Sequence, residues 1–339
     1  MPAEWEPHLG TWLAWPHERT DWPGKFEPIP WIYADIVRHL ARVERVRIVV
    51  RDASVRARVR EILKQSDVNL ATVDFFLAPT NRGWIRDFGP IFVVDGPGAV
   101  AVTNWRFNGW AKYDNWKKDD AVTDTVLRRL KLRSWKPESG AHRIVLEGGS
   151  IDVNGRGLML TTKECLLSDL QARNPELQRG NIEHGFRDYL GIQKVLWLNR
   201  GIAGDDTHGH VDDLARFVNP STVVTVVEED RKDVNYEPLK ENLDRLRGMT
   251  DQNGASLEIE TLPMPAPVYF DGQRLPASYA NFYIANKIVL VPTFSDPQDR
   301  TALDTIARLF PGRQIIGIPC RDLVLGLGTL HCMTQQQPA

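Results

Sequence analysis

One cysteine near the end of the chain stands where a nucleophile could reach a ligand. Cys332 follows Gly326-Leu327-Gly328 and precedes the polar pair Thr334-Gln335. Glycines let the backbone approach a ligand closely, and a cysteine thiolate is a strong nucleophile. Most free cysteines are inert small hydrophobic residues, but the glycines and polar neighbours favour a catalytic role here.

Four earlier stretches share this outline, in which a polar residue beside a glycine or another small residue leads into a short apolar segment. The leading residues of the five stretches are Asp87, Glu147, His210, Asn281 and Cys332. They recur at intervals of roughly 50 to 70 residues, a loose repeat of one supersecondary unit. Each could have an ordinary structural role alone. Five at one phase of a repeat predict a shared site.

The segments between these residues predict the same series of elements in every unit, namely strand, tight turn, strand, helix and strand. Helices are predicted over 119–130, 174–190, 236–249 and 299–309, the following strands over 143–146, 194–198, 257–262 and 314–318, and hairpin turns at 95–98, 154–157, 219–221 and 286–287. Radial repetition leaves few sheet edges exposed and brings equivalent residues to one central place. The sequence therefore predicts a single-domain α/β fold, a five-bladed propeller.

The first segment of the chain is predicted to complete this arrangement. A helix over 32–43, a strand over 46–50, a helix from about residue 54 and a strand over 69–77 follow the aromatic, proline-rich residues 1–31. The last unit lacks its second hairpin strand. We expect residues 11–15 to supply it, so that the segment 1–31 closes the ring.

The composition is that of a globular protein that acts on a small molecule. Of 339 residues, 42% are hydrophobic and 25% are charged. Lys and Arg number 42 and Asp and Glu 44, for a formal net charge of −2, which gives no electrostatic reason to expect nucleic acid or an anionic membrane as partner. Cys165, Cys320 and Cys332 have no zinc-like spacing and are interpreted as reduced thiols. Without an apolar run that could span a bilayer or an export signal, we expect a cytoplasmic protein.

The stretch 205–212 offers a general acid/base beside a carboxylate. On an extended strand, alternation of side chains would put His210 and Asp212 on the same side, a pairing that suits proton transfer. The same alternation leaves a second interpretation open, in which His208, His210 and Asp212 bind the metal ion of a metal-dependent hydrolase.

A thiolate, an imidazole and several carboxylates together favour a cationic ligand with an electrophilic carbon. Guanidinium has this character, because it stays protonated and offers five N–H donors in one plane to paired carboxylates. Burying two acids near a nucleophile without such a cation would cost several kcal/mol through repulsion and desolvation. We therefore expect the substrate to supply the compensating charge.

Motifs along nearly the whole chain resemble agmatine deiminases and the related bacterial peptidyl-arginine deiminases, of the guanidino-group-modifying superfamily with the pentein fold. They are MPAEWEP at 1–7, WIRDFGP at 84–90, FNGW at 107–110, LEGG at 146–149, DDTHGHVD at 205–212, YANFY at 279–283 and HCMTQQQP at 331–338. Two departures are His208, where many relatives carry an acid or amide, and the reduced glycine run at 326–328.

The resemblance implies a five-bladed α/β propeller and a set of residue roles. The implied catalytic residues are Cys332 as nucleophile, His210 as acid/base, and Asp87 and Asp212 as guanidinium ligands; the implied substrate-binding neighbours are Trp84, Glu147, Asp206 and Asn281. The implied reaction needs no cofactor and no metal. Cys332 attacks the guanidinium carbon, ammonia leaves, and water releases the ureido product from a thiouronium intermediate.

Agmatine is the first expected substrate, giving N-carbamoylputrescine and ammonia, a step towards putrescine. Free arginine would need a cationic partner for its α-carboxylate, and peptidyl arginine an open groove. Both remain alternatives, as do transfer of the amidino group to an amine and a non-catalytic propeller that binds guanidines. A homodimer is an expectation from the family alone.

Overall fold

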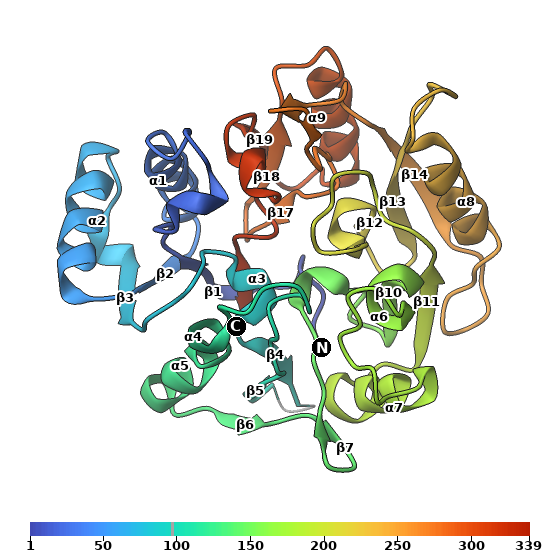
Figure 1. Ribbon diagram of the computed structural model, residues 1–339, viewed down its shortest axis with the longest axis horizontal. Coiled ribbons are helices and arrows are strands. Elements are labelled where there is room, and N and C mark those ends of the chain that lie inside the picture. The colour runs from blue at the N-terminus through green and yellow to red at the C-terminus, as the bar shows by residue number, and fades with distance from the viewer. Residues whose placement is uncertain (96–97) are drawn as a thin grey trace.

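A computed structural model describes residues 1–95 and 98–339 of the chain. The turn predicted at 95–98 includes residues 96 and 97, which lie outside the described residues. Within the described ranges, five mixed sheets have three or four strands each. Figure 1 shows these sheets placed around the middle of the molecule, with helices towards its outside.

Four of the five sheets repeat one unit, in which an antiparallel hairpin is followed by a helix and a third strand parallel to the hairpin's second strand. The strands are β4 (Ile91–Val94), β5 (Val100–Thr103) and β6 (Arg133–Trp135); β9 (Asp152–Val153), β10 (Leu158–Thr162) and β11 (Lys194–Leu198); β12 (Ala215–Phe217), β13 (Thr222–Val227) and β14 (Glu258–Pro263); and β17 (Tyr283–Ile284), β18 (Ile288–Thr293) and β19 (Gln314–Pro319). The connecting helices are α4 (Lys117–Asp120) with α5 (Val122–Leu130), α6 (Lys163–Leu167) with α7 (Arg179–Leu190), α8 (Tyr236–Arg247) and α9 (Gln298–Leu309). The predicted unit is therefore confirmed.

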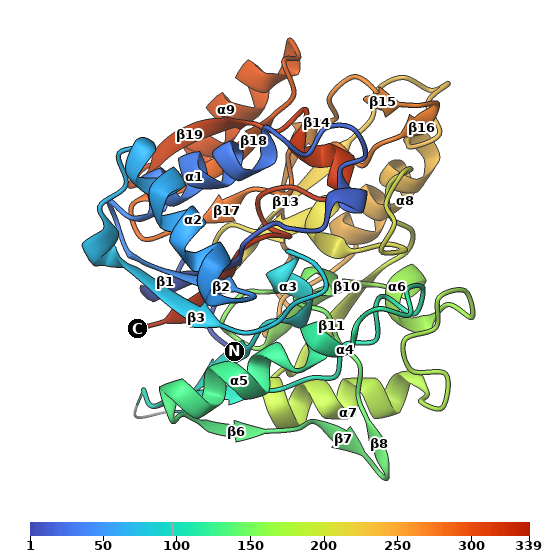
Figure 2. The ribbon, with the colours of Figure 1, turned by 60° about the vertical axis from the view of Figure 1, so that its left-hand side comes forward.

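The remaining sheet joins the two ends of the chain. Its order is β20 (Gln335–Pro338), β1 (His8–Ala14), β2 (Arg45–Val50) and β3 (Val73–Leu77), with α1 (Ile29–Leu40) and α2 (Ala53–Gln65) between consecutive parallel strands. β1 pairs antiparallel with β20, so that Thr11 lies opposite Gln336 and Trp12 opposite Gln335. Figure 2 shows this pairing beside the C-terminus. The hairpin partner missing from the last unit thus comes from the start of the chain.

Local sequence signals explain most element boundaries. Asp52 caps α2 by accepting a hydrogen bond from the backbone N–H of Val55 at 2.8 Å. The helix predicted from residue 174 begins at Arg179, because Pro175 disfavours helical backbone at the residue before it and Gln178 forms a capping box with Asn181. None of the described helices has the length and apolar character needed to cross a bilayer.

One predicted strand is wrong. Residues 143–146 do not form the third strand of their sheet; Arg133–Trp135 does, and its three side chains are all exposed. A short polar strand at a sheet edge carries no apolar signal, so it escapes pattern reasoning. Ile144, Val145 and Leu146 are buried, and Val145 makes only an isolated bridge with Arg106. These buried residues directly precede Glu147, which is buried as well.

Candidate active site

Each of the five repeat residues lies a few residues before a strand of a different sheet. Asp87 is in the single-turn helix α3 (Ile85–Phe88), and Glu147 and His210 cap the 3₁₀ turns Gly148–Ser150 and Val211–Asp213. Asn281 precedes β17, and Cys332 lies in a turn before β20. Turns at the ends of separate sheets bring residues far apart in sequence to one place.

The predicted reason for pairing His210 with Asp212 is wrong, although the two side chains do lie close together. His210 caps the 3₁₀ turn Val211–Asp213, so residues 210–212 do not form an extended strand. His210 Nδ1 is 4.0 Å from Asp212 Oδ1. A polar stretch with Gly209 at φ +92° turns instead of extending, since this backbone angle favours glycine.

Cys332 is held by an amide and lies against a carboxylate. Its Sγ is 3.1 Å from Asn281 Nδ2 and 3.6 Å from Asp212 Oδ2. Asn281 Oδ1 in turn accepts hydrogen bonds from Thr329 Oγ1 at 2.8 Å and from the backbone N–H of His331 at 3.0 Å. Asn281 therefore fixes both the thiol and the turn that carries it.

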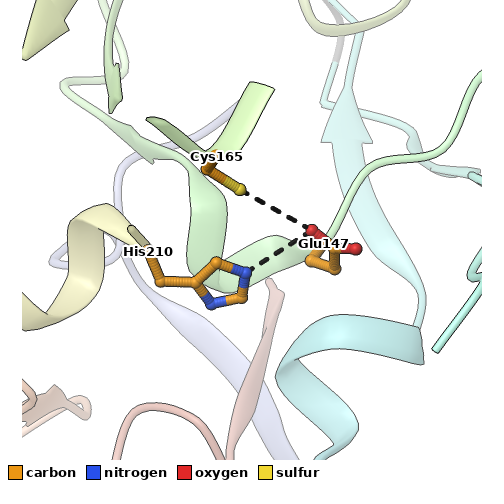
Figure 3. Close-up of side chains that lie close together, drawn as sticks. All are labelled: Glu147, Cys165 and His210. Carbon is orange, nitrogen blue, oxygen red and sulfur yellow. Dashed lines mark hydrogen bonds and ion pairs between the residues drawn. The ribbon is translucent and has the colours of Figure 1, made fainter. Parts of the chain in front are cut away.

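His210 is buried between carboxylates on both sides of its ring. Its Nε2 is 3.4 Å from Glu147 Oε2, and its Nδ1 is 3.8 Å from Asp87 Oδ1. Figure 3 shows the Glu147 side together with Cys165, whose thiol donates to Glu147 Oε2 at 4.0 Å. Among the described residues, His210 Nδ1 has no hydrogen-bond partner. The ring is thus anchored through Nε2 and presents Nδ1 to the cluster around Cys332.

Glu147 is a structural anchor for that ring. Arg173 Nε donates to both of its carboxylate oxygens, at 3.0 and 3.2 Å, and neither side chain is exposed. Burial alone would raise the pKa of Glu147, but Arg173 and His210 outweigh it and lower the pKa. Glu147 therefore stays ionised beneath His210.

Two hydrogen-bond donors fix the orientation of the Asp87 carboxylate. Trp110 Nε1 donates to its Oδ2 at 2.9 Å, and the backbone N–H of Gly149 donates to its Oδ1 at 3.0 Å. Burial raises the pKa of Asp87 to about 6, and the nearby Asp212 and Glu147 charges add to this increase while His210 opposes it. A cation bound beside Asp87 would favour its ionised form.

A cavity of about 430 Å³ opens onto this cluster and is lined by Trp84, Asp87, Trp110, Asp206 and Cys332, among others. Asp206 lies on the wall, where it accepts a hydrogen bond from Tyr113 Oη at 2.7 Å and forms an ion pair with Lys112. Of the predicted site residues, Glu147, His210, Asp212 and Asn281 do not line the cavity. The cavity therefore joins the thiol to carboxylates, including those of Asp87 and Asp206, and to two indole rings.

The free site stabilises the protonated thiol. Burial raises the pKa of Cys332 well above its ordinary value, and the charges of Asp212, Asp213 and Asp87 raise it further. Burial lowers the pKa of His210, but Asp87, Cys165 and Glu147 outweigh it and raise the pKa well above its ordinary value. The free site thus holds Cys332 as a neutral thiol and His210 as an imidazolium.

The metal-site interpretation of His208, His210 and Asp212 does not fit the geometry. His208 turns away, with its Nε2 3.2 Å from Ser168 Oγ. In the described part of the chain, the groups of possible metal ligands whose donor atoms converge are Glu147, Cys165 and His210, and Asp212, Asp213 and Cys332. His208 belongs to neither group.

Sequence reasoning missed several residues of this site. Trp110, Arg173, Asp213 and His331 contact its carboxylates or thiol, and Asp21 lines the cavity. Trp110 and His331 lie inside motifs noted above and could have been found there. Arg173 lies in a loop and Asp21 in the 3₁₀ turn Arg19–Asp21. Neither has a local sequence signal, and only the fold brings them to the site.

Gly149 provides a sharp test of this packing. A Cβ at this position would lie 2.6 Å from His210 Nδ1, 2.9 Å from Asp87 Oδ1 and 3.0 Å from Asp212 Oδ2. Gly149→Ala should therefore displace these groups and lower kcat/KM by about 10²-fold, since small misplacements have costs of that order. Gly180→Ala is the matched control, because nothing lies within 4 Å of its added Cβ. Equal activity of both variants would contradict the geometry.

Comparisons with known proteins identify the family. The family of Porphyromonas-type peptidyl-arginine deiminases matches residues 1–338. A Pseudomonas aeruginosa protein described as agmatine deiminase is 35% identical, covering 100% of this chain and 95% of that protein. The solved agmatine deiminase of Enterococcus faecalis is 32% identical with a TM-score of 0.91, covering 100% of this chain and 95% of that one. An inosamine-phosphate amidinotransferase from Streptomyces griseus, 15% identical with a TM-score of 0.51 over 100% of this chain and 97% of that one, shares the fold alone. The chain therefore belongs to the family of Porphyromonas-type peptidyl-arginine deiminases and is similar over its whole length to agmatine deiminases.

Proposed function

We propose that the protein hydrolyses agmatine to N-carbamoylputrescine and ammonia. The observation that carries this proposal is the buried Cys332 thiol beside the carboxylates of Asp212 and Asp87. Among the described residues, Asp212 Oδ1 has no hydrogen-bond partner although it is buried. A guanidinium between Asp87 and Asp212 would satisfy both carboxylates and set its carbon near Cys332 Sγ. The names of the full-length relatives support the same reaction.

The residues around Cys332 divide the reaction into two halves. The thiolate attacks the guanidinium carbon, His210 gives a proton to the departing nitrogen, and ammonia leaves an S-alkylthiouronium on Cys332. His210 then takes a proton from a water molecule that attacks the same carbon, and the ureido product departs as the thiol reforms. His210 Nδ1 is the nitrogen available for both transfers, because Nε2 faces Glu147.

Substrate binding would itself activate the nucleophile. The pKa of Cys332 is raised by burial and by three neighbouring aspartates, so the free thiol holds its proton. A guanidinium brings positive charge within a few ångströms of the sulfur and lowers that pKa. We infer that substrate binding makes the thiol release its proton to solvent, which leaves the thiolate, while His210 keeps the proton that it later gives to the departing nitrogen.

The charges around the cavity favour agmatine over arginine. Its wall carries the side chains of Asp21, Asp87, Asp206 and Asp271 but a single arginine, Arg82, among the described residues. Arg82 is already paired with Asp21. An α-carboxylate would thus enter a negative cavity without a free cationic partner, whereas the distal amine of agmatine carries the complementary charge.

Ammonia release from agmatine, free arginine and a blocked arginine peptide tests this assignment. We expect kcat/KM for agmatine to exceed that for arginine by about 10- to 100-fold, the effect of leaving one charged group without a partner. Higher kcat/KM for arginine or the peptide would overturn the substrate. Release that requires an added amine acceptor would instead indicate amidino transfer.

We further propose that the five sheets are the blades of a five-bladed propeller, with the segment 1–31 closing the ring in one domain. The repeated hairpin, helix and parallel strand support this arrangement, as does the pairing of β1 with β20. The five site residues would then occupy equivalent inner positions of successive blades. An experimental structure with its sheets in an open row would contradict the proposal.

A further inference from the structure

A buried chain of charged side chains leads from the start of the protein to the candidate active site. Glu4 Oε2 is 2.9 Å from His331 Nε2, and His331 Nδ1 is 2.7 Å from Asp212 Oδ2. The same Asp212 oxygen is 3.6 Å from Cys332 Sγ. Glu4, His331 and Asp212 are 6%, 2% and 0% exposed. No step of the reaction described above uses Glu4 or His331.

The contacts of His331 determine its charge. Each ring nitrogen faces a carboxylate oxygen, and a carboxylate can only accept a hydrogen bond while ionised. Both nitrogens must therefore donate, which requires an imidazolium. The backbone C=O of His331 also accepts a hydrogen bond from Arg86 Nε at 3.1 Å, so the ring is fixed at its backbone as well.

Glu4 is itself held in place by several donors. Arg86 Nη2 lies 3.2 Å from one of its oxygens, and Arg216 Nη2 lies 3.0 Å from the other. The backbone N–H of Ile284 donates to Glu4 at 2.8 Å. The N-terminal segment thus places the Glu4 carboxylate in the interior, where it binds Nε2 of His331.

We propose that His331, held as an imidazolium by Glu4, is a positioning residue that orients Asp212 and keeps it ionised for guanidinium binding. This inference rests on the proposed function. His331 acts through Asp212 and does not contact the substrate. Its role is to supply the positive charge that lets a buried aspartate stay ionised beside other acids.

The groups that surround Asp212 show why such a charge is needed. His210, Asp87, Asp213, Cys332, His331 and Arg216 face it from the packed turns and strands. Burial alone would raise the pKa of Asp212, but the hydrogen bond and charge of His331, together with His210 and Arg216, lower it. Asp213, beside it and without a histidine of its own, has a pKa that burial and the charge of Asp212 raise well above its ordinary value.

His331→Asn separates charge from hydrogen bonding. The asparagine amide can still donate to Asp212 from near the Nδ1 position, but it carries no charge and cannot reach Glu4. The pKa of Asp212 should rise, and protonated Asp212 binds guanidinium poorly. In the wild type the acid limb of kcat/KM for agmatine should follow Asp87, whose pKa is about 6. In the variant Asp212 titrates as well, so we expect that limb to steepen and move to higher pH, a further loss of about tenfold at the acid end with little loss at alkaline pH.

Two further variants make the result interpretable. Glu4→Gln keeps an acceptor for His331 Nε2 and removes the charge, so it should shift the acid limb in the same direction by less. His184→Asn is the matched control, since this ring is exposed and pairs with Asp188 on α7, and it should leave the profile unchanged. An equal loss of kcat/KM at every pH in the His331 variant would indicate a structural role and overturn the proposal.

The charge of His331 can also be read without any turnover. With ¹⁵N-labelled imidazoles in the wild-type chain, which has eight histidines, NMR should show the His331 ring protonated on both nitrogens under the conditions of the activity assay. His8 and His210 are the other buried histidines among the described residues, and the spectra of His8→Asn and His210→Asn together leave the His331 signal assigned. A neutral His331 ring overturns the inference even if His331→Asn does not fold. Failure of the wild type to release ammonia from agmatine would instead overturn the proposed function.

Discussion

Replacing Cys332 by serine should lower kcat for agmatine by about 10⁴-fold or more, while agmatine still binds. A serine hydroxyl ionises far less readily than a thiol, and the Asp212 carboxylate that contacts this position is too weak a base to deprotonate an alcohol. The cation-binding carboxylates Asp87 and Asp212 remain in place, so the affinity should change little. Steady-state ammonia release measures the first effect and calorimetry of agmatine binding the second.

Cys320→Ala serves as the control for this experiment. Cys320 is also fully buried, but it follows β19 and does not line the cavity. The control should retain activity, with at most a modest loss of thermal stability from the smaller side chain. Acid-quenched mass spectra of wild-type protein with agmatine should show an adduct on the peptide that contains Cys332. An active serine variant without such an adduct would rule out Cys332 as nucleophile.

The repeat could be predicted from the sequence because its strands are strongly patterned. The strand predicted over 194–198 coincides with β11, and the predicted helices near 236–249 and 299–309 coincide closely with α8 and α9. Apolar runs between turn residues specify such elements locally. The strand at Arg133–Trp135 could not be found in this way, because its side chains are exposed and its place is set by pairing with β5.

The types of the site residues and their positions in the repeat were enough to find them in the sequence. Their relative geometry could not be predicted in this way. Sequence alternation explained the pair His210 and Asp212 by a strand that does not exist, while the real cause is a 3₁₀ turn. Partners such as Arg173 reach the site only through long-range packing. Glu147 is an example. The repeat points to it, but the sequence does not show that Arg173 pairs with its buried carboxylate and keeps it ionised.

Asp87→Asn should lower kcat/KM for agmatine by about 10²- to 10³-fold, mainly through a higher KM. Removing one partner of a buried charge pair costs about 2–5 kcal/mol in comparable interfaces, which corresponds to this loss. An asparagine has one acceptor oxygen, so it cannot keep the hydrogen bonds from both Trp110 and Gly149. Asp169→Asn, at an exposed position, should have no effect.

The pH dependence of the Asp87 variant makes the prediction specific. Because burial raises the pKa of Asp87 to about 6, the wild-type carboxylate is protonated below that pH and kcat/KM should fall there. The variant lacks this titration and should lose that part of the acid limb. Removing a negative charge near the sulfur should also lower the pKa of Cys332 in the free protein, so alkylation by iodoacetamide should begin at lower pH than in wild type. An unchanged alkylation profile would show that the charge of Asp87 does not affect the pKa of Cys332. The substrate-induced formation of the thiolate would then lose its electrostatic basis.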